Sequence, residues 1–368
     1  MKVVLLTALI TGIFAALASY QYELANTSKK LKNNKNKYTS YYFFVFLSVA
    51  TLVCVSGLRY YVGADYGGYY HGYPRFVMEF EEKVRNWNEP GLAIIAKLLY
   101  TFSHDGAVFM FVLSAITISF FCYTISKRTD TYFFSIMLYI FSSCWTSSFS
   151  GARQYLASAI LFLGHYFIYE RKFIKYCVIV FIASSFHITA LVMLPMYFLI
   201  TQVLDLKKIV FIIVSGITLV FSYDFMFQLV GVLKNDTTSG TDQYAQNQIH
   251  PLRILIAFAP IILYFLLLLQ NKGFTGTENF YMGFIFVRAA LIFGTANSAY
   301  LNRIDIYFTP FLCIALSKLV HKFPKSQHFI LKATILVLYF IVWYYIDASQ
   351  IRWQWISARG GGYVNIYA

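Results

Sequence analysis

One candidate for a chemical role in this sequence is an arginine near the start of a predicted helix. Gly151 and Ala152 interrupt a long apolar run, and the helical pattern resumes with Arg153 in its first turn. The free N–H groups and the positive dipole of a helix N-terminus bind anions, and a guanidinium adds a two-point contact for phosphate. Arg153 is therefore a candidate for binding phosphate and for stabilising developing negative charge. The alternative is that Arg153 only extends towards lipid headgroups.

Three further arginines occupy comparable or more buried positions. Arg253 follows a proline in the first turn of a predicted helix, and Arg303 begins another apolar run. Arg303 and Asp305 could pair with each other, but a spacing of two does not put them on one helix face, so a different partner for each is the alternative. Arg288 lies inside a predicted membrane span, where an arginine needs a partner. A buried structural role for Arg288 is at least as well supported by the sequence as a catalytic role.

Two side chains are candidates for a general base. His187 interrupts two short apolar runs, and ionisable residues at membrane depth are often functional. A neutral imidazole also accepts a proton readily near pH 7. Asp65 lies just after an apolar run, in a segment rich in glycine and tyrosine. A hydrogen-bonded histidine at a helix junction is the alternative for His187.

The segment 57–76, where the chain leaves an apolar run, contains Arg59, Asp65 and six tyrosines. An interfacial aromatic belt explains the tyrosines. It does not explain Arg59 and Asp65, which a sugar phosphate ligand does. Aromatic faces such as those of Tyr66 and Tyr69 pack on sugar rings, while the charged groups bind hydroxyls or phosphates.

The composition requires these residues to be positioned by membrane helices. The chain has 368 residues, of which 59% are hydrophobic and only 12% charged, about half the charge of a soluble domain. One bilayer crossing needs ~20 apolar residues, so we expect an all-α polytopic membrane protein, a single domain over residues 1–368. The twelve predicted spans are 3–20, which we expect to be retained rather than cleaved, 38–57, 107–126, 131–149, 152–169, 173–186, 188–204, 209–222, 252–270, 280–297, 304–320 and 329–347.

The basic residues separate between the two faces that these spans define. Fifteen of nineteen lysines lie on or next to one face, which the positive-inside rule makes cytoplasmic. Eight of eleven arginines lie at the other face, where the long segments 58–106 and 223–251 are predicted to form the lip of an active site. The net charge of +14 therefore needs no nucleic acid to explain it. The five cysteines lack metal-ligand spacing, and we expect no metal or cofactor.

Short motifs in a fixed order give this sequence a family resemblance. The motifs are Gly57-Leu58-Arg59, Val62-Gly63-Ala64-Asp65-Tyr66 with Tyr69, Glu89-Pro90-Gly91, Arg153-Gln154, Phe186-His187, and Arg303 with Tyr307-Phe308. With these motifs the chain resembles the EpsG/Wzy-type polysaccharide (O-antigen and exopolysaccharide) polymerases over roughly residues 45–320. Where the family often has Gly-Thr-Asp, this chain has Gly-Ala-Asp, so Ala64 cannot supply a hydroxyl.

The resemblance implies a GT-C-type glycosyltransferase at the outer face of the bacterial cytoplasmic (inner) membrane. Both its donor and its acceptor would be undecaprenyl-diphosphate-linked glycans. It would contact membrane lipid, and its expected partner protein is a chain-length regulator. No nucleotide sugar is needed. The expected roles are diphosphate binding and leaving-group stabilisation by Arg59, Arg153, Arg253 and Arg303, base catalysis by His187 or Asp65, and glycan contact by Tyr66 and Tyr69.

Other functions remain open at this point. An O-antigen ligase shares the donor and the mechanism. A lipid-linked oligosaccharide flippase has a similar number of helices, but its cationic residues should line a path through the membrane. An integral acyltransferase needs polar groups that reach towards a cytosolic acyl donor, whereas this chain concentrates its polar groups outside.

Overall fold

The computed structural model describes residues 1–27, 37–129, 131–221, 248–298 and 301–358, and every regular element in these ranges is helical. The loop predicted at 223–251 therefore lies outside the described residues except for its last four positions, as do Lys29, Lys30, Lys32, Lys35 and Arg359. The α-helices are α1 (Lys2–Thr27), α2 (Thr39–Gly57), α3 (Tyr66–Met78), α4 (Phe80–Arg85), α5 (Pro90–Tyr100), α6 (Gly106–Arg128), α7 (Tyr132–Phe141), α8 (Cys144–Ser147), α9 (Ala152–Gly164), α10 (Tyr166–Tyr169), α11 (Phe173–Ser184), α12 (Met196–Leu199), α13 (Leu206–Phe221), α16 (Pro251–Leu269), α17 (Gly276–Gly294), α18 (Phe311–Val320) and α19 (Lys325–Ile346). Short 3₁₀ helices are η2 (Ile188–Met193), η3 (Leu301–Tyr307), η4 (Ala348–Gln350) and η5 (Ile356–Ala358).

Five helices in the described part of the chain are long and apolar enough to cross a membrane: α1, α2, α6, α16 and α19. The all-helical prediction and the multi-pass character are thus confirmed in outline. The number of twelve crossings stays a prediction, because several other apolar helices have only 10–17 residues. The apolar segment 91–100 belongs to α5, which at 11 residues is too short to cross a membrane by itself.

Four predicted spans are divided into two helical pieces rather than forming one continuous helix. Pro310 separates η3 from α18, and Pro195 separates η2 from α12, because proline lacks the N–H that would continue the hydrogen-bond ladder. Ser143, with a positive φ of 68°, separates α7 from α8. His165 divides α9 from α10. The breaks next to Ser143 and η3 lie beside the charged residues described below.

Local sequence fixes the starts of the two helices that carry Arg253 and Arg288. Pro251 occupies the first turn of α16, and the His250 side chain accepts a hydrogen bond from the Leu252 N–H at 3.2 Å. Thr275 and Glu278 form a reciprocal capping box at the start of α17. These caps set where along each helix its arginine lies.

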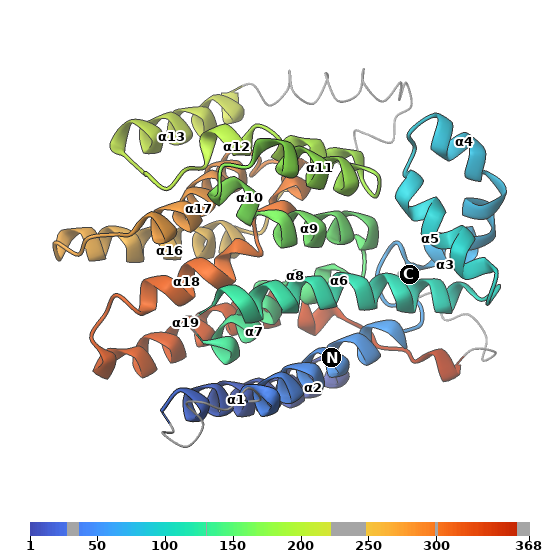
Figure 1. The fold of residues 1–368 in the computed structure, drawn as a ribbon, viewed down its shortest axis with the longest axis horizontal. Coiled ribbons are helices and arrows are strands. Elements are labelled where there is room, and N and C mark those ends of the chain that lie inside the picture. The colour runs from blue at the N-terminus through green and yellow to red at the C-terminus, as the bar shows by residue number, and fades with distance from the viewer. Residues whose placement is uncertain (28–36, 130, 222–247, 299–300, 359–368) are drawn as a thin grey trace.

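The connections between helices gather at two ends of the bundle (Figure 1). One end holds α3, α4 and α5, and the α16–α17 and α18–α19 turns lie at the other. Lys322 Nζ joins these two turns, with 3.1 Å contacts to the Gly273 carbonyl and to the Glu278 carboxylate.

Large aromatic side chains fill the core between the helices. Trp145 and Trp343 are fully buried, and each donates its indole N–H inside the protein, to Ser56 Oγ at 2.8 Å and to Thr146 Oγ1 at 3.2 Å. A buried polar group without a partner is costly, so these two hydrogen bonds permit the burial. They fix α8, just after the α7–α8 break, against α2 and α19.

Candidate functional site

The connection between α8 and α9 is held by the loop that follows α2. Gly63 has a φ of +104°, and a Cβ there would lie 2.1 Å from the Phe149 carbonyl oxygen. Only glycine allows this approach. The next N–H, that of Ala64, donates to Ser150 Oγ at 3.1 Å. The loop therefore packs against the residues just before Arg153 and directs Asp65 towards the start of α9.

Arg153 lies in the first turn of α9 and binds two side chains from the α3–α5 region. Its Nε donates to Tyr69 Oη at 2.8 Å, and its Nη1 donates to Glu89 Oε1. The guanidinium also lies over the Tyr69 ring, 5.4 Å from its centroid. One arginine thus joins α9 to α3 and to the start of α5.

Glu89 is the residue of this site to which the sequence alone assigned no role. It occupies the left-handed conformation, φ 59° and ψ 47°, at the N-cap of α5. Such a conformation in a non-glycine residue is strained and often accompanies a functional site. The signal available in the sequence was a carboxylate directly before Pro90-Gly91, in a segment predicted to be external. The Gly91 N–H donates to the Ser185 carbonyl at 2.9 Å, which ties the start of α5 to the end of α11.

This tie brings His187 to Glu89. His187 precedes η2 at the break predicted from the sequence, and its Nδ1 lies 3.6 Å from Glu89 Oε1, slightly beyond hydrogen-bond length. Burial opposes ionisation of Glu89, but its contacts with His187 and Arg153 outweigh this and lower the pKa of the carboxyl. Glu89 is therefore a carboxylate shared between a guanidinium and an imidazole.

Asp65 lies half-buried at the start of α3, on the same side of the molecule. Burial raises the pKa of its carboxyl, and the nearby Arg303 and Arg153 act in the opposite direction. A carboxylate with a raised pKa accepts a proton more readily than an exposed one. The structure thus brings together Asp65, Tyr69, Arg153 and His187 from the predicted set and adds Glu89. We call these five residues the α9 cluster.

Arg59 and Tyr66 lie under this cluster rather than on its surface. The Arg59 side chain is buried, where its Nε donates to the Val62 carbonyl at 3.1 Å and its Nη1 to Ser114 Oγ at 2.9 Å and to the Ser56 carbonyl. Burial lowers its pKa to about 10. Tyr66 is also buried, with its ring 5.6 Å from the guanidinium. Substrate contact by either residue stays a prediction; their visible contacts support the loop.

The remaining predicted arginines surround a cavity on the other side of α9. The cavity has a volume of about 170 Å³, and Arg253, Arg288 and Arg303 all line it. Arg253 Nη2 donates to Asp347 Oδ1 at 2.6 Å, and Ser143 Oγ donates to the other carboxylate oxygen. Gln154 Nε2 donates to the Arg303 carbonyl at 2.9 Å, which links the cavity wall to α9.

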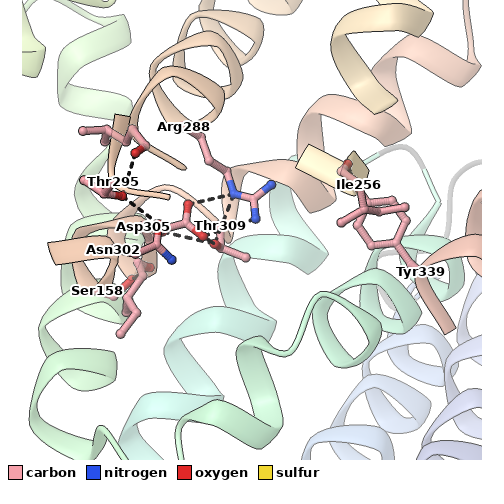
Figure 2. A network of polar contacts seen from close by, with 10 residues as sticks. Ser158, Ile256, Arg288, Thr295, Asn302, Asp305, Thr309 and Tyr339 are labelled. Atoms are coloured by element: carbon pink, nitrogen blue, oxygen red, sulfur yellow. Dashed lines mark hydrogen bonds and ion pairs between the residues drawn. The ribbon is translucent and has the colours of Figure 1, made fainter. Parts of the chain in front are cut away.

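Arg288 and Asp305 form the buried ion pair of this wall (Figure 2). Arg288 Nε lies 2.9 Å from Asp305 Oδ1 and 3.2 Å from Thr309 Oγ1. The Thr309 hydroxyl also lies 2.9 Å from Asp305 Oδ2. The partner that Arg288 requires inside the protein is thus Asp305, from η3, two positions after Arg303. In the described ranges no three His, Cys, Asp or Glu side chains come together as metal ligands.

A family model of the EpsG family matches residues 40–356. The chain belongs to the EpsG family. The matched range contains the whole α9 cluster and all three arginines of the cavity, and membership of EpsG supports a membrane polysaccharide polymerase. No curated protein and no solved structure matches this chain. The resemblance inferred from the short motifs is therefore confirmed at the level of the family.

Proposed function

We propose that this EpsG-family protein polymerises lipid-linked oligosaccharides at the outer face of the bacterial cytoplasmic membrane. It transfers a growing glycan from an undecaprenyl-diphosphate donor onto the terminal sugar of the next lipid-linked repeat unit. Family membership supports the polymerase activity. The observation that carries the mechanism is the α9 cluster, in which proton-accepting groups and a guanidinium meet at one helix start.

The chemistry requires one proton acceptor and a stabilised leaving group. The acceptor hydroxyl oxygen attacks the anomeric carbon of the donor while its proton passes to the Asp65 carboxylate. The bond between the anomeric carbon and the diphosphate oxygen breaks, and its electron pair stays with the diphosphate. A base positioned in this way contributes typically about 10²–10⁴-fold in rate. Arginines stabilise the departing charge without a metal.

The other members of the cluster keep Asp65 and His187 in place. Arg153 holds Tyr69 and Glu89 and adds positive charge beside Asp65, which favours its ionised form. Glu89 faces His187 and orients the imidazole, which is the second candidate for the base. A donor that carries its own diphosphate leaving group needs no nucleotide. A chain-length regulator is the partner that we expect beside this enzyme.

The glycans of a strain that lacks the protein test this proposal. We expect the strain to lose long polymer and to retain single repeat units on the outer face of the membrane. Normal polymer that fails only to reach its final acceptor would instead indicate a ligase. Accumulation of lipid-linked repeat units on the inner face would indicate a flippase. Either result would overturn the polymerase.

A further inference from the structure

A second cavity lies beside the loop that follows α2. It has a volume of about 190 Å³ and is lined by residues 61–63, 149–150 and 350–352 together with Thr146. It shares no lining residue with the arginine-lined cavity described above. One water occupies ~10–15 Å³ of such a volume, so the second cavity has room for about as many atoms as one sugar residue contains.

Tyr61 is fixed in the wall of this cavity. Its backbone has a positive φ of 52°, a conformation that is rare for a bulky residue and that clusters at functional sites. Its hydroxyl is hydrogen-bonded to His71 Nε2, and its ring packs edge-on against Tyr60, with 4.8 Å between the centroids. A fixed aromatic ring beside polar side chains is a surface on which a sugar ring packs. Tyr66 and Tyr69, by contrast, are buried.

The segment after α19 brings two polar side chains to the same cavity. It pairs with the loop after α2 as a short strand would: the Tyr60 N–H donates to the Gln354 carbonyl at 2.9 Å, and the Ile356 N–H donates to the Leu58 carbonyl at 3.0 Å. This pairing holds Gln350 and Arg352, which both line the cavity, on the loop that carries Tyr61.

Arg352 gives the cavity a single positive charge, because every other residue that lines it is uncharged. Arg153, Arg253 and Arg288 each contact a carboxylate, but the exposed Arg352 side chain has no such contact within the described ranges. A guanidinium binds a planar carboxylate through two parallel hydrogen bonds, and one positive charge balances one carboxylate. The Gln350 amide beside it can hydrogen-bond sugar hydroxyls.

We propose that this cavity binds an acidic sugar of the repeat unit, a hexose that carries a carboxylate, and that Arg352 is the residue that distinguishes it from a neutral sugar. This substrate class rests on the proposed function. Gly63 lines the cavity, and Asp65 follows it two positions later, so the bound sugar lies beside the loop that carries the proposed base. Tyr61 packs on the sugar ring, and Arg352 pairs with its carboxylate.

Binding of small glycosides to the purified full-length protein tests this inference without turnover. The probes are two matched pairs, methyl glucuronide with methyl glucoside and methyl galacturonide with methyl galactoside, whose members differ in one carboxylate. By ligand-observed NMR we expect at least one uronide to bind about fivefold or more tightly than its neutral counterpart. The preference should shrink at high salt, because exposed ion pairs are screened. Equal binding within both pairs would overturn the inference.

Three variants separate the charge from the ring. Arg352→Gln should lower uronide binding to that of the neutral sugar and leave the neutral sugar unchanged; the side chain is exposed, so the fold loses no buried contact. Tyr61→Leu should weaken both members of a pair by a similar factor. Arg75→Gln, at an exposed arginine paired with Glu79, is the control and should leave the preference intact. A preference that survives Arg352→Gln, or full binding by Tyr61→Leu, would overturn the inference.

The polymer itself distinguishes failure of this inference from failure of the proposed function. We expect sugar analysis of the polymer from the parent strain to find a carboxylate-bearing sugar in the repeat unit. A polymer without one, lost in the deletion strain, would overturn the acidic-sugar site and leave the polymerase standing. An Arg352-dependent uronide preference in a protein whose deletion strain makes normal polymer would support the site and overturn the polymerase.

Discussion

Asp65 is the residue whose charge the proposed mechanism needs most directly. Asp65→Asn keeps the size of the side chain and removes the proton acceptor, so we expect polymerisation to fall by about 10²–10⁴-fold while the protein still accumulates in the membrane. The matched control is Tyr60→Phe. The Tyr60 ring packs against Tyr61, and its backbone N–H donates a hydrogen bond to the Gln354 carbonyl. Wild-type polymer from Asp65→Asn would leave His187 as the base.

The same residue predicts the acid side of the pH profile. Burial raises the pKa of Asp65, so its carboxylate takes up a proton at a higher pH than an exposed aspartate does. Because only the ionised form accepts the proton of the acceptor, polymerisation in membranes should decline as the pH falls through this raised pKa. Repeat-unit transfer measured against pH checks this. An acid limb at the ordinary aspartate pKa of ~3.9 would contradict it.

Arg153 is the residue whose geometry matters more than its charge. Lysine keeps the charge, but its ammonium cannot hold Tyr69 and Glu89 with the spacing of a guanidinium. Arg153→Lys should therefore reduce polymer formation nearly as much as Arg153→Ala, by about a hundredfold. Arg75→Lys, at an exposed arginine that pairs with Glu79, serves as the control. Full activity of Arg153→Lys at normal protein level would show that the site needs only a positive charge at this position, not the two-point geometry of a guanidinium.

At the scale of elements, the site depends on the loop after α2 packing against the α8–α9 connection. Gly63→Ala would place a Cβ 2.1 Å from the Phe149 carbonyl and force an unfavourable positive φ, which together cost at least about 2 kcal/mol. We expect a lower melting temperature and shorter polymer, because the loop carries Asp65. Gly68→Ala is the matched control in α3, where an added Cβ meets no atom within 4 Å. Equal behaviour of the two variants would contradict this packing.

At the scale of the whole molecule, we predict that the two ends of the bundle lie on opposite sides of the membrane. The lysine bias predicts an external α3–α5 end and a cytoplasmic start of α13. Met78 and Leu206 are both well exposed, at 81% and 73%. An impermeant thiol reagent applied from outside should label Met78→Cys above the parent level and leave Leu206→Cys at that level until the membrane is opened. The reverse pattern would invert the topology and the proposed outer-face site.

The sequence by itself determined the membrane class, the helical fold and the family. Those properties follow from local composition, from apolar runs between charges and from short ordered motifs such as Gly63-Ala64-Asp65. It also placed breaks correctly at Gly151 and before His187, because glycine and a polar interruption act within a few residues of themselves. The role of Glu89 was not visible, since its partners Arg153 and His187 are 64 and 98 positions away along the chain.

Only the tertiary structure decided which arginines act together. Along the chain, Arg59, Arg153, Arg253 and Arg303 look alike, because each begins or ends an apolar run. In the fold, Arg59 is buried among carbonyls, Arg153 joins Tyr69 and Glu89, and the other two line a cavity with Arg288. Local sequence patterns predict how deep a side chain lies in the membrane. They do not predict which neighbouring helix the side chain faces. Packing between helices sets that direction, and with it the position of the arginine-lined cavity on the opposite side of α9 from Tyr69 and Glu89.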